Sequence, residues 1–542
     1  MSFVHRIFEG CQAAGSRPVL YEVQGPELVA TSGRQLLSDV ARARGFLRAA
    51  GVAPGDRVGL LAPNGARWVA VDLAIMAEGA ICVPLYTRQA PTQLAAMMRD
   101  CGPRLLLTAD DALSLALAES WPEHGRIATY AEAFASEPLT GPPAEVATDT
   151  PATIIYTSGT SGEPKGAMLS YANIDHMLGV TVRELGKMSR ARHTEDRVFQ
   201  YLPFCFAGSR IMLLSQLVRG NSLMMSTDLE RLQQELQVAA PHYCLNVPAL
   251  LERIRSAVIQ RLRETGGPLF AVYERAVAAH ALQSDGRGGL VDRAFLALAQ
   301  RVLFPRVRRS IGANLEFLVC GSAPLGEATQ RWFEMIGIPV YQVYGLTETT
   351  AIATIDDTTR VVPGRVGHAI EGCEITLGPE GELLCRGPNV FLGYWNRPQA
   401  SAEALRDGWL HTGDQAEIDG RGNVKVIGRV KEVLVPESGH NVPPAPLEQR
   451  LVEASARVQQ ALVVGHGRPF LTAIVTGDAD PHELDRVRDE VNAQLPHYMR
   501  VRRLYRVPEP WSADNGLLTA NQKLKRKAIE ARYRDAIEQM YR

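Results

Sequence analysis

Residues 156–166 read Tyr-Thr-Ser-Gly-Thr-Ser-Gly-Glu-Pro-Lys-Gly and follow the apolar pair Ile154 and Ile155. The apolar entry is typical of a strand, and the glycines that follow let the backbone approach an anion closely. The stretch also carries four uncharged hydroxyl donors and one cation, a combination that suits a phosphate group. We therefore predict a phosphate-binding loop. The candidate residues in it are Thr157, Ser158, Gly159, Thr160, Ser161 and Lys165.

Two plainer interpretations of residues 156–166 compete with phosphate binding. The spacing departs from GxxxxGK[ST], so the stretch is not the common P-loop. A flexible Gly/Ser linker would share its composition. The strand-like entry, Pro164 beside Lys165 and the amphipathic segment at 168–178 count against a linker. We therefore expect the loop to be part of a folded site.

The chain before the loop alternates between helical and strand-like patterns. Apolar residues recur at helical spacing from Leu36 to Leu47, and short apolar runs follow. We expect a helix that ends near Gly51, a second helix at 66–77, and strands at 57–61, 80–83 and 105–108. This βαβα order favours a parallel sheet with helices on both faces.

Two later strand patterns each end in a polar loop. Residues 315–320 lead into Gly321, Ser322 and Ala323, and residues 339–343 lead into Tyr-Gly-Leu-Thr-Glu-Thr at 344–349. Open α/β sheets bind ligands at such loops, beyond the carboxyl ends of their strands. Glu348 is a metal candidate, because Mg²⁺ is normally held by a hard carboxylate together with phosphate oxygens. An N-capped helix start is the plainer explanation of this string.

The length of the chain indicates more than one domain. It has 542 residues, 46% of them hydrophobic, and single cores stop growing near roughly 250–300 residues. The pattern changes after Gly428, so we predict domains at residues 1–428 and 429–542 with a hinge at 429–432. The second domain suits a small α+β module.

Charge and cysteine content argue against several classes of protein. Lys and Arg number 58 against 59 Asp and Glu, a net charge of −1, so there is no overall electrostatic case for a nucleic-acid partner. The eight cysteines are scattered, as expected of core residues in a reducing compartment. The sequence shows neither a secretory signal nor a spanning segment, so we expect a cytoplasmic protein.

Residues 251–311 are helical in character and rich in arginine. The plain interpretation is a solvated helix face. The alternative is a docking surface, either for peripheral contact with a membrane or for the phosphates of coenzyme A.

With these motifs the sequence resembles the adenylate-forming (AMP-binding) superfamily. The helical insertion at 251–311 is most like that of medium- and long-chain fatty acyl-CoA synthetases. The resemblance implies an α/β fold with a large N-terminal domain of parallel-rich sheets wrapped by helices and a small mobile C-terminal α+β domain. It also implies that a carboxylic acid reacts with ATP, with Mg²⁺ present, to give an acyl-adenylate, and that the acyl group then passes to coenzyme A.

The resemblance assigns roles to the residues around the two loops. Lys165 and the hydroxyls of its loop would bind phosphate, as would Thr347, and Glu348 would hold the metal. Tyr344 with Gly345 would stack on adenine, and Gln342 would hydrogen-bond the adenine amino group. The opposite wall of the adenosine pocket would be Gly321, Ser322 and Ala323.

The resemblance also assigns roles in the last third of the chain. Asp414 and Arg429 would bind the ribose hydroxyls, and Lys431 would be the hinge. Lys523 would be the catalytic lysine, while Lys525, Arg526 and Lys527 suit a solvated basic helix start. The thiol would enter near Gly439.

One motif departs from the family pattern. Phe206 stands where fatty acyl members carry His, and Ser209 stands where they carry an acidic residue. We expect Phe206 to line an acyl pocket for a hydrophobic acid, together with Phe204, Ala207, Gly321 and Ala323. Two alternatives stay open: transfer of the acyl group to an acyl carrier protein, and a non-catalytic acyl- or nucleotide-binding protein.

Overall fold

The computed structural model describes residues 2–158, 164–189, 195–513, 515–519 and 523–542. Contacts within the chain divide it into two compact units. The larger unit comprises Met1–Thr87, Pro91–Glu374 and Cys385–Leu410, and the smaller unit comprises Arg88–Ala90, Ile375–Leu384 and His411–Arg542. The functional boundary at residue 429 stays a prediction.

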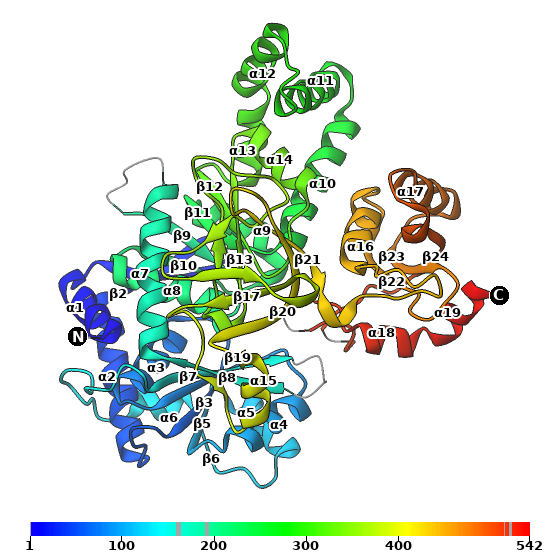
Figure 1. Ribbon diagram of the computed structural model, residues 1–542. Helices are drawn as coiled ribbons and strands as arrows, with labels where there is room; N and C mark the ends of the chain where they lie inside the picture. The colour runs from blue at the N-terminus through cyan, green and yellow to red at the C-terminus, as the bar shows by residue number, and fades with distance from the viewer. Residues whose placement is uncertain (1, 159–163, 190–194, 514, 520–522) are drawn as a thin grey trace. The chain divides into compact units, whose positions relative to one another are not determined.

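A nine-stranded sheet forms one half of the larger unit (Figure 1). Its six central strands run parallel, and antiparallel strands complete both edges. In spatial order the strands are β15 (His368–Ala369), β14 (Thr354–Ile355), β13 (Val340–Tyr344), β12 (Phe317–Cys320), β11 (Tyr243–Asn246), β9 (Arg197–Gln200), β10 (Ser222–Ser226), β1 (Pro18–Gln24) and β2 (Glu27–Ser32).

A seven-stranded sheet forms the other half of the larger unit. Five of its strands run parallel, and two antiparallel strands are added beyond β7. In spatial order they are β18 (Gly393–Tyr394), β8 (Pro164–Ser170), β7 (Pro151–Ser158), β4 (Ile81–Leu85), β3 (Arg57–Leu61), β5 (Leu105–Thr108) and β6 (Arg126–Thr129). The predicted α/β class is thus confirmed, with parallel-rich sheets and helices packed against them.

Helices cover both sheets. Those that precede β9 are α1 (Phe3–Ala14), α2 (Gly33–Ala49), α3 (Ala66–Ala77), α4 (Pro91–Cys101), α5 (Asp111–Ser120), α6 (Tyr130–Ala135) and α7 (Tyr171–Met188). Those that follow it in the larger unit are α8 (Ala207–Arg219), α9 (Leu232–Ala239), α10 (Pro248–Thr265), α11 (Gly267–Ser284), α12 (Leu290–Val302), α13 (Phe304–Ile311), α14 (Glu327–Ile336) and α15 (Pro398–Ala404). In the described residues no helix combines the length and apolar character that a bilayer crossing needs.

Helix α3 lies between the two sheets. It packs against β3 and β4 of one sheet and β1 of the other, and all of its residues except Arg67 are buried. A helix that is apolar on every side is stable only in such a place. Its one buried acid, Asp72, forms an ion pair with Arg210 of α8, and Arg210 also donates to the Thr153 hydroxyl at 2.5 Å. This pair links α3 and α8 to the strand that leads into the phosphate loop.

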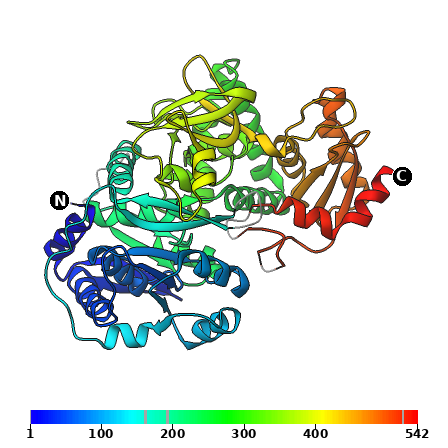
Figure 2. The same cartoon turned by 60° about the horizontal axis from the view of Figure 1, so that its bottom comes forward.

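A third sheet contains β16 (Glu374–Leu377), β17 (Glu382–Arg386), β20 (Trp409–Ile418) and β19 (Leu405–Arg406), and β21 (Val424–Arg429) pairs with β20. The smaller unit has a sheet of its own, visible in Figure 2. It consists of β22 (Val458–Val464), β23 (Leu471–Gly477) and β24 (Val501–Val507). Its helices are α16 (Pro444–Glu453), α17 (Pro481–Ala493), α18 (Arg526–Arg532) and α19 (Arg534–Tyr541).

The small sheet is buried on both faces. Alternate residues of one strand point in opposite directions, so Ala461 and Val463 join the core formed with α16 and α17. Leu462 and Val464 join a second core with α18 and α19. The C-terminal segment that carries Lys523 is therefore anchored by one of the two cores.

Several predicted elements match the structure closely. The strands at 57–61 and 105–108 and the helix at 66–77 have the predicted bounds. The segment at 168–178 is different, because residues 168–170 end strand β8 and the helix begins at Tyr171. Ser170 caps that helix by accepting a hydrogen bond from the Asn173 backbone. The end of this strand has mixed polarity and shows no clear two-residue alternation. The sequence pattern therefore did not separate the end of the strand from the helix that follows it.

Candidate active site

The phosphate loop connects two paired strands. β7 and β8 run antiparallel, with Thr157 opposite Lys165 and Ser158 opposite Pro164. The Thr157 hydroxyl donates to the Lys165 carbonyl at 3.4 Å. Gly159, Thr160 and Ser161 lie outside the described residues. The hairpin fixes where the loop begins and ends, and places Lys165 at its base.

A tyrosine links the phosphate-loop lysine to the candidate metal ligand. Lys165 Nζ lies 5.3 Å from the centre of the Tyr394 ring, a distance suited to cation–π attraction. The Tyr394 hydroxyl donates to Glu348 Oε1 at 2.7 Å. The structure therefore brings together Lys165 and Glu348, which are far apart in sequence, through Tyr394.

The backbone around Tyr394 and Glu348 is fixed independently. β18 pairs with β8, with Tyr394 opposite Ala167. The Phe391 backbone amide donates to the Glu348 carbonyl at 2.9 Å. Both ends of the Tyr394–Glu348 hydrogen bond are thus held by main-chain bonds.

The loop after β13 is tightly constrained. A Cβ on Gly345 would lie 2.0 Å from the Ala351 carbonyl oxygen, so no other residue fits there. Thr347 and Glu348 lie in a short 3₁₀ turn, Thr347–Thr349. Thr350 and Ala351 follow with φ of 51° and 96°, values that are unfavourable for residues with a Cβ. Strain of this kind is kept where the surroundings over-determine the backbone, often at functional sites.

The loop after β12 carries a second strained residue. Ser322 has φ of 74°, and Ser322 and Ala323 are exposed while Gly321 is buried. A Cβ on Gly321 would lie 2.8 Å from Val343 Cγ2. Gly321 therefore packs against β13 and leaves the next two residues accessible to a ligand.

Gln342 supports these loops from within the protein. Its side chain is 1% exposed; its carbonyl accepts from the Leu325 amide, and its NH₂ donates to Gln330 and to the Arg365 carbonyl. A bond to an adenine amino group would require an additional or exchanged partner. Within this structure Gln342 fixes the loop after β12 in place.

The Gln342 amide donates to Asp356 Oδ2 at 2.7 Å, and Gln330 donates to the same atom at 3.0 Å. Burial raises the pKa of Asp356 to about 7, and these hydrogen bonds offset part of that rise. Asp356 directly follows β14, the strand in which Thr354 pairs with Tyr344. A buried carboxyl that ionises near neutral pH thus lies beside the strand that carries Tyr344.

A metal ion could be held through Glu348. Among the described residues, no group of three or more His, Cys, Asp or Glu side chains could bind a metal by itself. Mg²⁺ is normally bound by one or two carboxylates together with substrate phosphates and water. A single carboxylate that keeps one oxygen beyond its bond to Tyr394 fits such a shared site.

In the smaller unit, the two candidate ribose ligands face each other. Asp414 and Arg429 are opposite each other on β20 and β21, and Arg429 Nε lies 2.9 Å from Asp414 Oδ1. The Asp414 backbone amide donates to the Thr412 hydroxyl at 3.1 Å. A carboxylate and a guanidinium held side by side present both acceptors and donors for hydroxyl groups.

The backbone of Lys523 is hydrogen-bonded to Thr519. Its amide donates to the Thr519 hydroxyl at 3.0 Å, and the Thr519 amide donates to the Lys523 carbonyl at 2.8 Å. Leu518 and Leu524 form a β-bridge beside it, and Leu518 is buried. The backbone of Lys523 is therefore fixed while its side chain is exposed.

The expectation that Arg526 is solvated is wrong. Its side chain is 15% exposed, with Nε 3.1 Å from Glu432 Oε2 and a short bond from Nη2 to Glu448. Glu448 in turn accepts from the Val463 amide at 2.7 Å. Because these acids come from segments distant in sequence, a local pattern could not reveal their approach. Arg526 connects the Lys523 segment to the residue that follows Lys431.

Gly439 occupies an exposed turn with φ of 75°. A Cβ there would meet nothing within 4 Å, so the backbone angle and not space favours glycine. The neighbouring His440 ring stacks on Tyr498, with centroids 4.3 Å apart.

The predicted acyl-pocket residues differ in their surroundings. Phe204 is fully buried and packs on Trp68, with ring centroids 5.2 Å apart, so it belongs to the core. Phe206 is half-buried, 5.7 Å from the Tyr86 ring, at the start of α8.

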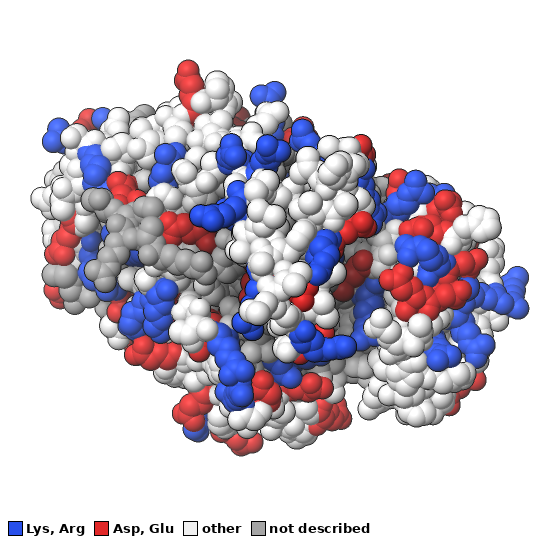
Figure 3. All heavy atoms as spheres, turned by 90° about the horizontal axis from the view of Figure 1, so that it is seen from above, with Lys and Arg blue, Asp and Glu red and all other residues white. Residues whose placement is uncertain are grey.

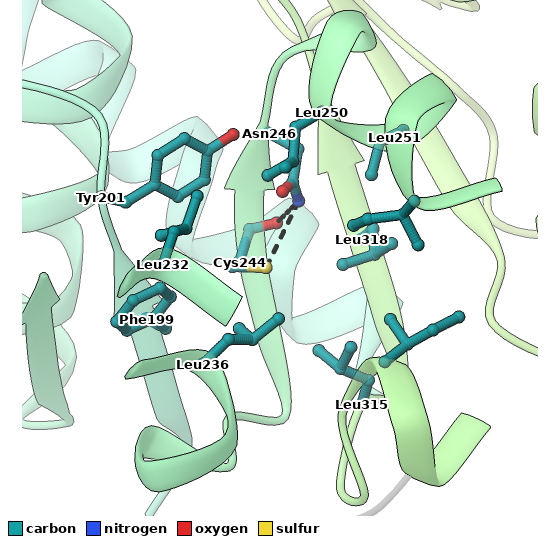
Figure 4. A pocket seen from close by; sticks show the side chains of 12 residues that line it. Phe199, Tyr201, Leu232, Leu236, Cys244, Asn246, Leu250, Leu251, Leu315 and Leu318 are labelled. Atoms are coloured by element: carbon teal, nitrogen blue, oxygen red, sulfur yellow. Dashed lines mark hydrogen bonds between the residues drawn. The ribbon is translucent and has the colours of Figure 1, made fainter. Parts of the chain in front are cut away.

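The structure contains an apolar cavity elsewhere in the larger unit (Figure 4). It lies along the nine-stranded sheet, between β9, β11 and β12 and the helices α9, α10 and α13, and its volume is about 20 Å³, enough for roughly one water. Its polar lining residues include Tyr201 and Asn246, and the Asn246 side chain donates to the Cys244 carbonyl at 2.9 Å. Residues that line it include Tyr201, Leu232, Leu236, Leu250 and Leu318. This cavity could not be predicted from the sequence, because its walls come from segments more than a hundred residues apart.

Tyr394 was also missed. Its surroundings, Gly393 and Trp395, carry no charge and no spacing that indicates chemistry. Only the folded structure shows the role of Tyr394, because the pairing of β18 with β8 brings Tyr394 beside the strand that carries Lys165.

Comparison with known proteins gives a consistent result. The profile described as AMP-binding enzyme matches residues 8–395, and that described as AMP-binding enzyme C-terminal domain matches residues 431–542. The long-chain-fatty-acid–CoA ligase FadD15 of Mycobacterium bovis is 30% identical, over 91% of this chain and 89% of that protein. The chloroplastic long-chain-fatty-acid–[acyl-carrier-protein] ligase AEE15 of Arabidopsis thaliana is 25% identical, over 94% and 82%. The O-succinylbenzoate coenzyme A synthetase of Bacillus subtilis, solved with ATP and magnesium ion, shares the fold with a TM-score of 0.73 at 20% identity, over 97% and 98%.

Proposed function

This chain belongs to the AMP-binding enzyme family, and we propose that it joins a hydrophobic carboxylic acid to a thiol in two steps. The acid first reacts with ATP to give an acyl-adenylate and pyrophosphate. The thiol of coenzyme A then displaces AMP to give the thioester.

The chemistry explains why such residues are needed. A carboxylate resists nucleophilic attack because it is an anion with a poor leaving group, and coupling to AMP removes both obstacles. The first step requires groups that grip the triphosphate and offset the charge that develops on it. Lys165 supplies a cation at the base of the phosphate loop, and Thr157 and Thr347 supply hydroxyl donors.

The observation that carries the proposal is the link from Lys165 through Tyr394 to Glu348. A protein that only binds an acyl group or a nucleotide does not need a carboxylate beside the cation of a phosphate loop. An enzyme that binds a triphosphate together with its metal ion needs the cation for the phosphates and the carboxylate for the metal. Glu348 would hold Mg²⁺, which would neutralise charge on the phosphates. Tyr394 orients the carboxylate for that purpose.

The remaining roles are proposed for the smaller unit and for the loops after β12 and β13. Asp414 and Arg429 bind the ribose hydroxyls, and Tyr344 stacks on the adenine opposite Ser322 and Ala323. Lys523 stabilises negative charge on the carboxylate and the α-phosphate during the first step. The thiol enters near Gly439, and Lys431 is the hinge between the steps.

For the acid we propose a fatty acid. The cavity beside β9, β11 and β12 is lined almost wholly by apolar side chains, and the 30% identical relative is named a long-chain-fatty-acid ligase. Each methylene buried contributes about 0.8 kcal/mol.

Two acceptors for the acyl group are compatible with this chemistry. Coenzyme A and an acyl carrier protein offer the same thiol arm, and AEE15 is named as a carrier-protein ligase. We favour coenzyme A, the acceptor named in the relative that is more similar.

The test is pyrophosphate release by purified protein with ATP, Mg²⁺ and a series of straight-chain acids, followed by thioester formation with coenzyme A alone. We expect the specificity constant to rise with chain length and then to level off. A preference for acetate or for an amino acid would contradict the acyl assignment. Adenylate formation without transfer to coenzyme A would point to a carrier protein, and no pyrophosphate release with any acid would point to a non-catalytic protein.

A further inference from the structure

Helix α12 exposes an unusual number of aliphatic side chains. Leu290 is 82% exposed, Val291 74% and Val302 60%. Leu298, 57% exposed, lies between the last two at helical spacing, so Val291, Leu298 and Val302 form one stripe. Val277 of the neighbouring α11 is also exposed. These two helices therefore contain five of the eleven exposed large hydrophobic side chains found in the described residues.

The inner face of α12 is apolar as well. Leu296 and Ala299 are buried and pack in the core together with Tyr273 and Ala276 of α11. A helix that is hydrophobic on both faces is normally covered on both. Contiguous exposed apolar surface usually marks a place where another molecule binds. We therefore expect the outer stripe of α12 to bind another molecule.

The charge around the stripe identifies the kind of partner. Residues 251–311 contain eleven Arg against five Asp and Glu, whereas the whole chain has a net charge of −1. Arg301 lies on the outer side of α12 between Leu298 and Val302, and Arg287, Arg306 and Arg309 are exposed nearby in sequence. Figure 3 looks down on the end of the larger unit from which α11 and α12 project, and shows uncharged surface with Lys and Arg groups on it as well as Asp and Glu groups. An aliphatic stripe flanked by arginines fits an anionic surface with an apolar interior.

We propose that α11 and α12 form a docking arm that lies on the surface of an anionic lipid bilayer. Helices that bind in this way bury their aliphatic side chains about 5–10 Å into the headgroup boundary, while arginines contact the lipid phosphates. Val291, Leu298 and Val302 enter the bilayer surface, and Arg301 binds a headgroup beside them. The arm docks the protein without spanning the membrane.

A second copy of the chain is a poorer occupant of the same stripe. Pairing two α12 helices through their stripes would bring their Arg301 residues and the surrounding positive charge together. Like charges in close contact oppose association. A lipid surface, by contrast, supplies the negative charge that this region lacks.

The test is flotation of the full-length protein with two kinds of vesicle, one of pure phosphatidylcholine and one of equal parts phosphatidylcholine and phosphatidylglycerol. We expect binding to the mixed vesicles, weakened by added salt, and little binding to the neutral ones. The double variant Val291→Glu/Leu298→Glu should bind the mixed vesicles at least about tenfold more weakly, because carboxylates must then enter the boundary. Arg301→Glu should weaken binding by roughly fivefold for each unit of charge changed.

Leu115→Glu is the matched control. Leu115 is 64% exposed on α5, outside the arm, so this variant should bind vesicles like the unchanged protein. Arg301→Glu keeps the test usable if the double variant fails to fold, which thermal unfolding would reveal. Equal binding to both vesicle types, or undiminished binding by a folded arm variant, would overturn the proposal. It would equally be overturned if the arm variants abolished self-association of a protein that does not bind vesicles.

Discussion

Asp72 and Asp356 are both buried carboxylates of the larger unit, but their charge is compensated in different ways. Asp72, between the two sheets, faces the guanidinium of Arg210. Burial raises the pKa of Asp72, and Arg210 opposes that rise. Asp356, beside β13, accepts hydrogen bonds from the Gln342 backbone and the Gln330 side chain, and burial raises its pKa to about 7.

The difference separates two tasks within one unit. A cation beside Asp72 holds the interior between the sheets together. Amide groups of Gln342 and Gln330 beside Asp356 hold the loops where the ligand is proposed to bind. The Asp356 carboxyl in this arrangement changes its charge near neutral pH. Substitutions in the interior should therefore act on stability, and substitutions around β13 should act on catalysis or on pH dependence.

Arg210→Met should have the largest effect. It leaves Asp72 buried without its cation, which costs about 3–5 kcal/mol of unfolding free energy. Urea unfolding would measure the loss. The double variant Arg210→Met/Asp72→Leu removes both charges and should recover most of it. Equal instability of the single and double variants would show that packing, and not the charge, is what Arg210 contributes.

Glu348→Gln should lower the rate of pyrophosphate release on the order of 10²- to 10³-fold, as expected when charge stabilisation in a reaction is removed. The unfolding free energy should change little, because Glu348 is only half-buried. Stopped assays at several Mg²⁺ concentrations would separate metal binding from the chemical step. A variant with full activity at limiting Mg²⁺ would exclude Glu348 as the metal ligand.

Asp356→Asn should change the pH dependence of stability. A carboxyl whose pKa rises to about 7 on folding binds its proton more tightly in the folded state, so its contribution is fully present below about pH 4 and is lost as the pH rises towards 7. Unfolding free energy of the unchanged protein should therefore fall relative to that of the variant by about 1 kcal/mol per pH unit between pH 5 and 7.

The control for this experiment is Asp357→Asn. Asp357 is exposed, and hydrogen bonds from Thr359 lower its pKa, so it stays charged throughout that range. If the Asp357 variant shows the changed slope and the Asp356 variant does not, the titrating group has been misassigned.

Tyr394→Phe should have the smallest effect of the four. It removes the hydroxyl that donates to Glu348 Oε1, and the loss of a group that orients a metal ligand typically costs about 10- to 100-fold in metal affinity or activity. We expect a higher Mg²⁺ requirement with nearly unchanged stability. A Mg²⁺ dependence like that of the unchanged protein would mean that Glu348 is oriented by its backbone alone.

The contrast between interior and site also explains how much the sequence could predict. The bounds of α3, β3 and β5 follow from apolar runs, a local property that survives folding. The candidate phosphate-binding loop and the loops after β12 and β13 could be proposed from the sequence because glycine, hydroxyl and charged residues follow strands directly.

Contacts between distant segments could not be predicted in this way. Tyr394 reaches Glu348 only because β18 pairs with β8. The side chain of Gln342 is hydrogen-bonded to Leu325, Gln330 and Arg365, partners that the spacing of residues in the sequence does not reveal. The basic run at 523–527 shows the same limit, since its four cations look alike in sequence although Arg526 forms ion pairs with Glu432 and Glu448.

Arg526 has a mechanical consequence for the proposed two-step reaction. Its bonds to Glu432 and Glu448 connect the segment that carries Lys523 both to the residue after the hinge and to α16. If the chain rotates at Lys431, that brace makes the lysine move in step with the hinge, without a separate rearrangement inside the smaller unit. The hinge angle and the position of Lys523 then behave as one degree of freedom, so a single rotation would switch the lysine in or out.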